Sequence, residues 1–322
     1  MHLKTMLAAT LLACSAVCLA DDYPNRAITF VVPSAAGGGL DVLTRTLAAD
    51  MSKRMGQPIV IENKPGASGM IAAQTVARAK PDGYTVLITT SAALTNVPFV
   101  YAKVPYDVKR DLAFVTQLWA GPLVLAVIRE VPAKTMKEFL EWAGQNKGKV
   151  NYGSFGVGTL GHLLGAYMSQ SKGLDMTHVA YKAEAPLIQD LVGGQVTWAI
   201  ATVGSLRPYF DSGRVRPLAV LGDHRSKELP NVPTLAEAGL TDPEYKPFGW
   251  VAMMAPAGTP PGVLGRLERG ARTSVQTPQM KVGLQAFAME PIGNSSADFR
   301  RDYEATTAMV ERLVKAAGAR ID

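Results

Sequence analysis

Short apolar segments alternate with helical patterns along most of this chain. Apolar runs at 28–33, 59–63 and 85–90 are separated by segments with helical spacing at 40–55 and 69–80. A run of about five apolar residues suits a buried strand, and each turn between the segments is short. Strands and helices in this alternation predict an α/β fold, with a parallel sheet covered by helices on both faces.

The same pattern restarts near residue 134. Strands are expected at 150–155, 177–181, 196–201 and 215–221, and helices at 134–145, 159–171, 185–192, 261–276, 278–287 and 296–317. Two further apolar runs, 118–128 and 248–255, join the two units. If both runs cross between the units, the second unit is an insertion within the first. The predicted domains are then 21–122 together with 247–322, and 123–246.

The first twenty residues have the pattern of a secretory signal peptide. Lys4 is followed by an apolar run at 6–17, and small residues around Ala20 suit cleavage before Asp21. Removing residues 1–20 leaves 302 residues with a net charge of +5 and no cysteine, because Cys14 and Cys18 are the only two. A buried N-terminal helix and a lipid anchor on Cys14 are the alternatives. We expect the protein to be exported.

Composition excludes several classes of protein. Hydrophobic residues make up 48% and charged residues 19% of the chain, which predicts a large core and excludes disorder. No stretch of eighteen apolar residues occurs, which excludes a membrane-spanning transporter body. The net charge of +6 is spread over the chain without a basic block, so nucleic acid is not an expected partner.

A first glycine motif, residues 33–41, lies between the first predicted strand and the first predicted helix. Three consecutive glycines, Gly37 to Gly39, allow positive φ angles and close approach of a ligand to the backbone. The following helix begins with unpaired N–H groups and a partial positive charge, which favours an anion. Asp41 falls in the first turn of this helix. A tight turn without a ligand is the alternative.

A second glycine motif, residues 152–162, has the same place in the other unit. Gly156, Gly158 and Gly161 spell G-x-G-x-x-G between a strand and a helix. A dinucleotide site is not supported, because no acidic residue ends the next strand, which finishes with Lys182. Ser154 and Thr159 add hydroxyl groups. Two anion-binding motifs, one in each unit, predict a single cleft between the units.

Other motifs are interpreted as structural. His162, His178 and His224 lack the spacing of metal ligands, and no G-x-S-x-G elbow for a catalytic serine occurs. Residues 66–69 (Gly-Ala-Ser-Gly) are expected to form a turn in which Ser68 caps the second helix.

Taken together, these motifs resemble those of a known family. The matching stretches are 33–41, 62–69, 80–85, 151–163, 180–182, 229–234 and 255–260. Jointly and in this order they are similar to the periplasmic substrate-binding proteins of tripartite tricarboxylate transporters, also called Bug-type receptors. The resemblance covers essentially the whole chain after residue 20.

The resemblance implies two α/β domains around a cleft, joined by two crossing strands, as in a Venus flytrap. It implies that backbone N–H groups and ordered water hold one carboxylate group of a small organic acid, aromatic acid or acidic amino acid. The residues carried over are Ala35, Ala36, Gly37, Gly38, Gly39 and Asp41 from the first motif, Ser154, Gly156, Gly158, Thr159 and His162 from the second, and Ser91 and Ala92 after the third strand.

The chain departs from the family pattern at four positions. Ser34 replaces a bulky aromatic residue, Gly39 a frequent proline, Ala183 a usual glycine and Thr197 a usual aspartate. Ser34 and Ala183 are expected to line the cleft, so its size and polarity should differ from those of amino-acid-binding relatives.

A non-catalytic receptor is therefore the leading interpretation. The protein is expected to be a monomer without cofactor or metal that presents a carboxylate to the permease subunits of a tripartite transporter or to a sensor. A secreted enzyme acting on a carboxylate is the alternative, although no catalytic residues with suitable spacing are found. A cytoplasmic dinucleotide-binding oxidoreductase is disfavoured by the signal peptide and the missing acidic residue.

Overall fold

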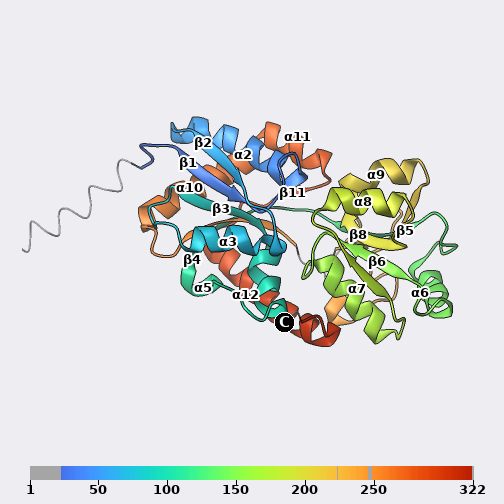
Figure 1. Cartoon of the computed structure of the whole chain (residues 1–322). Coiled ribbons are helices and arrows are strands. Elements are labelled where there is room, and N and C mark those ends of the chain that lie inside the picture. Colours follow the sequence, from blue (N-terminus) through green and yellow to red (C-terminus); the bar gives the residue numbers. More distant parts are fainter. Residues whose placement is uncertain (1–22, 223, 246–248, 321–322) are drawn as a thin grey trace, which may run out of the picture.

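The computed structural model describes residues 23–222, 224–245 and 249–320. The predicted signal peptide, its cleavage site and Cys14 lie outside these residues. Two lobes stand side by side, each built on its own sheet (Figure 1). The α/β, two-lobed fold class predicted from the sequence is confirmed.

The first lobe is built on a six-stranded sheet in the order β11-β4-β10-β3-β1-β2. Helices α2, α10 and α11 pack on one face of this sheet, and α3 and the first half of α12 pack on the other. The strands and helices are β1 (Ile28–Val32), β2 (Ile59–Asn63), β3 (Thr85–Thr90), β4 (Leu112–Ala120), β10 (Val251–Pro256), β11 (Glu290–Pro291), α2 (Gly39–Met55), α3 (Met70–Ala77), α10 (Pro261–Val275), α11 (Pro278–Ala286) and α12 (Ser296–Ala317).

The second lobe is built on a five-stranded sheet in the order β7-β6-β8-β5-β9. Helices α6 and α7 pack on one face, and α8 and α9 pack on the other. These elements are β5 (Leu123–Ile128), β6 (Asn151–Ser154), β7 (Thr177–Ala180), β8 (Trp198–Thr202), β9 (Val215–Leu221), α6 (Met136–Gln145), α7 (Leu160–Ser171), α8 (Glu184–Val192) and α9 (Val203–Asp211).

Short helical segments lie between the main strands and helices. They are η1 (Ala67–Gly69), η2 (Ala92–Asn96), α4 (Val97–Val100), α5 (Val108–Asp111) and η3 (Pro243–Tyr245). The segment η2 has π-helical hydrogen bonding, a geometry that is rare and is often found at functional sites.

Neither sheet is purely parallel, which corrects the expectation from the sequence. Strand β10 runs antiparallel to β3 and β4, and β5 runs antiparallel to β8 and β9. The reason is the path between the lobes. Val251 of β10 pairs with Thr90 at the end of β3, and Leu123 of β5 pairs with Thr202 at the end of β8. When the chain crosses from one lobe to the other, it therefore enters the new sheet at the carboxyl ends of the parallel strands.

The first crossing is short. Only Gly121 and Pro122 separate β4 from β5, and a Cβ atom at Gly121 would lie 2.8 Å from Cγ of Met289, so this position requires glycine. Strand β10 lies entirely within the first sheet. The second crossing therefore lies between Tyr245, which packs in the core that contains α7, and Val251 at the start of β10. Most of the predicted run 248–255 is thus strand of the first sheet rather than part of the crossing.

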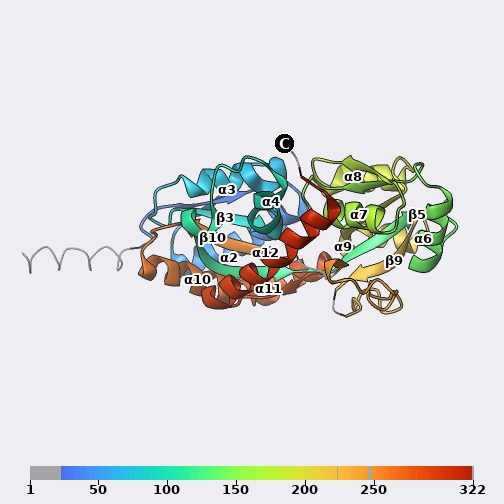
Figure 2. The ribbon, with the colours of Figure 1, turned by 90° about the horizontal axis from the view of Figure 1, so that it is seen from below.

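Helix α12 connects the lobes a third time, which the sequence did not indicate. Phe299 and Tyr303 in its first half belong to a core of the first lobe. Val310, Leu313 and Val314 in its second half pack into the core that contains α6 and α7. Figure 2 shows α12 running from the first lobe toward α7. Ser295 caps its start by accepting the N–H of Asp298, and Gly318 ends it with a φ of 58°.

None of the helices within the described ranges combines the length and the apolar character that crossing a membrane would require.

Candidate functional site

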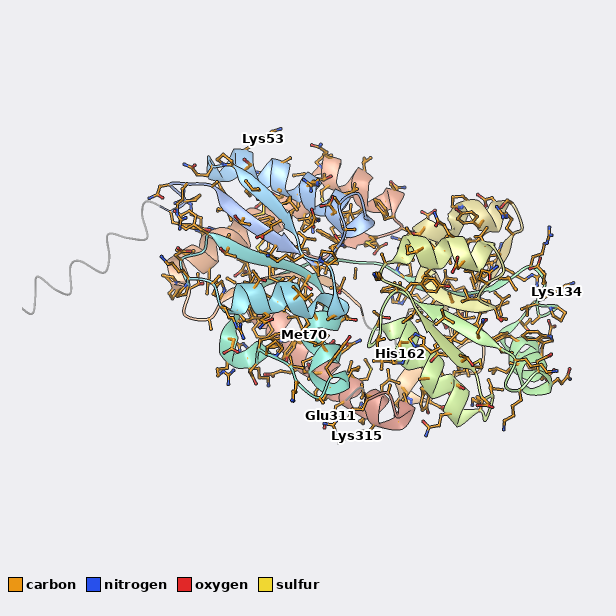
Figure 3. The ribbon with its side chains drawn as sticks, in the orientation of Figure 1. Lys53, Met70, Lys134, His162, Glu311 and Lys315 are labelled. Carbon is orange, nitrogen blue, oxygen red and sulfur yellow. The ribbon has the colours of Figure 1, made fainter. Side chains whose placement is uncertain are left out.

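The two glycine motifs follow the parallel strands of both sheets. The first motif follows β1 and the second follows β6, and each leads into a helix, α2 or α7. In Figure 3, Met70 at the start of α3 and His162 in α7 lie on opposite sides of the gap between the lobes. Both motifs therefore stand where ligands bind in open α/β sheets, beyond the carboxyl ends of the strands.

Asp41 holds the first glycine motif together. Its carboxylate accepts the N–H of Gly37 at 2.8 Å, Nε of Arg45 at 2.9 Å and the side-chain amide of Asn63 at 2.8 Å. The same amide of Asn63 donates to the carbonyl of Ser34 at 3.0 Å. Burial raises the pKa of Asp41, but the hydrogen bonds from Arg45, Gly37 and Asn63 outweigh burial and lower the pKa to about 2. Asp41 is thus a charged clamp on the loop.

These bonds correct the expectation that the glycines of the first motif offer free donors. The N–H of Gly37 is bonded to Asp41, and the N–H of Gly38 donates to the carbonyl of Ala35 at 3.2 Å. The N–H groups of the first turn of α2, at Gly39, Leu40 and Asp41, have no acceptor within the helix. The donors of this motif therefore lie at the start of the helix.

Ser34 carries an unpartnered hydroxyl group at this motif. Among the described residues, Ser34 is one of four whose buried side-chain oxygen or nitrogen has no hydrogen-bond partner. A buried polar atom without a partner is costly. Ala35, Ala36, Gly37 and Gly38, which follow it, are exposed.

In the second glycine motif, two hydroxyl groups hold one carbonyl. Ser154 donates to the carbonyl of Gly156 at 2.9 Å, and the hydroxyl of Thr159 donates to the same oxygen at 2.7 Å. Both side chains are buried. Because the hydroxyl hydrogen of Ser154 is used in this way, its oxygen accepts Nε2–H of His178 at 2.8 Å. The hydroxyls expected to face a ligand thus fix the loop instead.

His162 and His178 form a partly buried pair next to this motif. Their rings stack with centroids 4.1 Å apart, and Nδ1 of His162 accepts the N–H of Gly158 at 3.0 Å. Burial lowers the pKa of His162 to about 4, and burial together with His162 lowers the pKa of His178 to about 4. Both rings are therefore neutral at pH 7. Sequence reasoning missed the role of His178, because its contact with Ser154 joins two strands.

The remaining predicted residues have different surroundings. Ser91 and Ala92 are buried where β3 leads into η2. Ala183 is partly exposed in extended backbone just before α8. Among the described residues, no hydrogen bond links Ala183 to either glycine motif.

Two side chains of the first lobe contact the second motif across the gap. Nδ2 of Asn96 donates to the carbonyl of Gly158 at 2.6 Å, and the hydroxyl of Ser68 donates to the carbonyl of Val157. Ser68 does not cap α3: Gly69 holds that position, without a side-chain cap. The sequence prediction for Ser68 was therefore wrong. Neither contact has a local sequence signal, because each joins residues about 60 to 90 positions apart.

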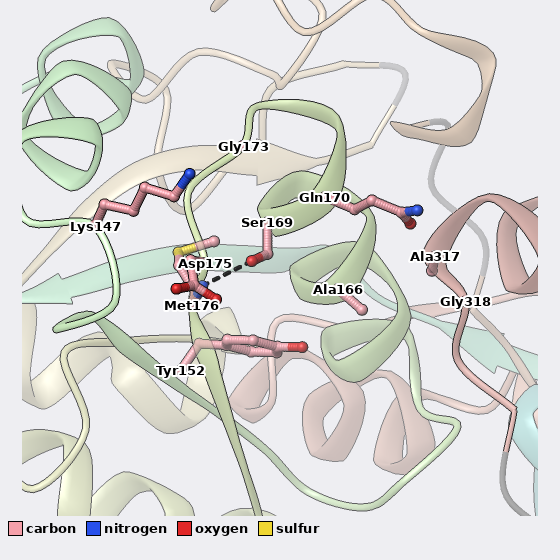
Figure 4. A pocket seen from close by; sticks show the side chains of 10 residues that line it. All are labelled: Lys147, Tyr152, Ala166, Ser169, Gln170, Gly173, Asp175, Met176, Ala317 and Gly318. Carbon is pink, nitrogen blue, oxygen red and sulfur yellow. Dashed lines mark hydrogen bonds between the residues drawn. The ribbon is translucent and has the colours of Figure 1, made fainter.

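A separate cavity of about 510 Å³ lies at the other end of α7 (Figure 4). Its walls include Lys147, Tyr152, Ser169, Asp175 and Ala317. The predicted ligand residues are not among those that line it. Within the described part of the chain, no group of three or more His, Cys, Asp or Glu side chains could hold a metal ion.

Comparison with known proteins identifies the family. The model described as "Tripartite tricarboxylate transporter family receptor" matches residues 43–319. Protein BugT of Bordetella pertussis is 34% identical over 272 residues, which cover 84% of this chain and 82% of BugT.

Two solved structures share the fold closely. Rpa4515 of R. palustris, solved with adipate, has a TM-score of 0.85 and 34% identity, covering 92% of this chain and 99% of that one. MatC (Rpa3494) from Rhodopseudomonas palustris, solved with bound malate, has a TM-score of 0.82 and 27% identity, covering 91% and 100%. This chain thus belongs to the receptor family of tripartite tricarboxylate transporters, the Bug-type periplasmic solute-binding proteins.

Proposed function

We propose that this protein captures a small carboxylate between its two lobes and delivers it to the membrane permease of a tripartite transporter. The observation that carries the proposal is the pair of glycine motifs, one at the start of α2 and one at the start of α7. A helix N-terminus favours an anion through its free N–H groups and its dipole. The adipate and malate in the structures of Rpa4515 and MatC support the ligand class.

The proposed contacts to the carboxylate are the first-turn N–H groups of both helices and the hydroxyl of Ser34. In the second motif these N–H groups belong to Leu160, Gly161 and His162, which follow the cap residue Thr159. The other residues of the predicted site shape the loops around the ligand. Because Ser34 carries an unpartnered buried hydroxyl, a ligand oxygen near it would gain a hydrogen bond at little cost.

Ligand capture is proposed to involve domain movement without chemistry. We assign residues 21–122 and 247–322 to one domain and 123–246 to the other, with Gly121 and Pro122 in the hinge. Helix α12, which packs on both lobes, limits the movement to a rotation that keeps its contact with α7. A carboxylate that touches both motifs favours the closed arrangement by its difference in affinity for the two states.

The destination of the ligand is proposed from the family. A permease of the tripartite type is the expected partner, and a sensor protein is the alternative. A pull-down with the permease subunits distinguishes the two, because only a transport receptor should bind them.

Export is tested by N-terminal sequencing of the protein from its native host. A start at Asp21 supports a cleaved signal peptide, a lipid on Cys14 supports the anchored form, and an intact Met1 in the cytoplasm contradicts both.

A panel of mono-, di- and tricarboxylates, including adipate and malate, tests the function. A ligand at about 100 times its Kd should stabilise the folded state by roughly 2.7 kcal/mol, which a thermal shift detects and titration calorimetry then quantifies. Mass analysis of the ligand after incubation checks that it is unchanged. A folded protein that no carboxylate in the panel stabilises would contradict the proposal.

A further inference from the structure

The segment that carries Ser68 is held in an unusual backbone conformation. Four consecutive residues have positive φ angles: Gly66 at 125°, Ala67 at 45°, Ser68 at 52° and Gly69 at 92°. Glycine adopts such angles freely, but alanine and serine do so at a cost in free energy. Strained residues persist only where the surrounding structure holds them, and they cluster at functional sites.

The strained backbone directs the hydroxyl of Ser68 to the other lobe. It donates to the carbonyl of Val157, in the second glycine motif, rather than to the amides of its own helix α3. Gly156 makes room for this approach, because a Cβ atom there would lie 3.1 Å from the hydroxyl oxygen of Ser68. The contact thus depends on the positive φ of Ser68 in the first lobe and on the absence of a side chain at Gly156 in the second.

The neighbouring carbonyl of the same motif is held in a different way. Asn96 is 1% exposed, and its amide donates to the carbonyl of Gly158 at 2.6 Å. The hydroxyl of Thr95 donates to Oδ1 of Asn96 at 2.7 Å and so fixes the amide with its NH2 group toward Gly158. Val100, in the helix α4 that follows Asn96, is buried in the core that contains α7. The Asn96 contact is therefore a buried anchor within an apolar region shared by both lobes.

Ser68, in contrast, is partly exposed. The hydroxyl of Ser68 therefore meets Val157 where solvent can reach the contact, whereas the amide of Asn96 meets Gly158 inside a buried region. We infer that the Ser68 hydroxyl is a latch that holds the second glycine motif against the first lobe and favours the closed arrangement before ligand binds. This inference rests on the proposed capture of a carboxylate between the lobes, and Ser68 acts in it as a positioning residue.

The latch predicts the effect of removing one hydrogen bond between the lobes. Loss of a neutral hydrogen bond should lower the ratio of closed to open protein by about two- to tenfold. Because only the closed arrangement makes all ligand contacts, apparent affinity should fall by up to the same factor.

The test measures the distance between the lobes without any added carboxylate. Spin labels on cysteines at Lys53 and Lys134, which are exposed on the first and second lobes (Figure 3), report this distance in a protein that starts at Asp21 and has no other cysteine. Ser68→Ala and Ser68→Gly should both broaden the distribution toward longer distances. Glycine adopts the φ of 52° without strain, so Ser68→Gly should fold even if the alanine variant is less stable.

Two further variants separate a latch from a general loss of stability. Ser68→Asn keeps a side-chain donor and tolerates the left-handed backbone, so it should restore part of the shorter distances. Ser52→Ala removes a hydroxyl that donates to the carbonyl of Gln57 within the first lobe and should leave the distribution unchanged. An unchanged distribution in both folded Ser68 variants, or equal broadening in Ser52→Ala, would overturn the latch. Failure of carboxylate capture would appear separately, in the panel of ligands.

Discussion

Nε2 of His178 lies 2.8 Å from the hydroxyl oxygen of Ser154, and this contact joins a stack of aromatic rings to the second glycine motif. The ring of Tyr152 lies 5.0 Å from that of His178 on one side and 5.0 Å from that of Trp198 on the other. His162 continues the stack toward Gly158. The motif is therefore held from the core of its own lobe as well as by the contacts from the first lobe.

The histidine pair predicts how stability depends on pH. Both rings have a pKa of about 4 in the folded protein, against about 6.5 in the unfolded chain. Between pH 6.5 and pH 4 the unfolded chain binds protons that the folded protein does not, so the free energy of unfolding should fall as the pH decreases. Full titration of both rings would cost roughly 6 kcal/mol, and because the rings are partly exposed to solvent the loss should be on the order of 3 kcal/mol for the pair. These groups should have almost no effect above about pH 7.5.

Urea denaturation between pH 4.5 and pH 7.5 measures this slope. His178→Gln keeps a side-chain amide donor for Ser154 and removes one of the two titrating rings, so it should flatten the slope by about half. The carboxylate of Asp41, whose pKa is about 2, titrates outside this range. The same slope in the wild type and in His178→Gln would contradict the assignment.

Asp41 should stabilise the first glycine motif rather than hold the ligand itself. Asp41→Ala leaves the N–H of Gly37 and the side chains of Arg45 and Asn63 without their acceptor, which should cost about 1–3 kcal/mol of unfolding free energy and weaken ligand binding. Glu311→Ala breaks an exposed pair with Lys315 and should change stability by less than about 0.5 kcal/mol. Chemical denaturation gives the free energy of unfolding of both variants. An equal decrease in the two would contradict the stabilising role of Asp41.

A side chain at Gly38 should obstruct the proposed site. Gly38 has a φ of −70°, which any residue adopts, so Gly38→Val should fold and should weaken carboxylate binding by more than about tenfold. Gly158, at a φ of 79°, is a poorer probe because valine there would also be strained. Gly144→Val in α6 is the control, because Gly144 is exposed and a Cβ atom there meets only Leu174, at 3.9 Å. Calorimetry that finds equal affinity in Gly38→Val and the wild type would remove this loop from the site.

Gly204 should be required for the contact between the lobes beside the hinge. A Cβ atom there would lie 2.6 Å from the carbonyl carbon of Phe287, so Gly204→Ala should cost about 1–3 kcal/mol by overpacking. Gly265→Ala, in α10, meets only the flexible end of Arg269 and should gain about 0.5–1 kcal/mol from helix propensity. Thermal denaturation of both proteins gives the comparison. If Gly204→Ala left the free energy of unfolding unchanged, the lobes would not be packed tightly at this point.

Local patterns account for what the sequence predicted correctly. The bounds of β2, β3 and α12 agree with the predicted 59–63, 85–90 and 296–317, because apolar periodicity and the adjoining turn and cap residues determine them. Helix α9 was missed, and its interior Pro208 is a residue that normally ends a helix. The bridging position of α12 depends on two cores that meet only in the folded protein.

The site shows the same division between local and distant signals. The two glycine motifs were found because their residues are contiguous between a strand and a helix. Asn63, Asn96 and Ser68 were not, since each is a single polar residue whose partner lies far along the chain. Asn63 had one usable signal: it ends a parallel strand next to the first motif. The hydrogen bonds within each motif, which decide which N–H groups remain free, have no sequence pattern at all.

The distance between spin labels at Lys53 and Lys134, measured while a carboxylate from the panel is added, tests the central claim most directly. Capture between the lobes predicts that the distribution narrows toward shorter distances at the concentrations at which calorimetry detects binding, and that Gly38→Val requires more ligand for the same change. Saturating binding of the carboxylate without any change in this distance would contradict capture by closure.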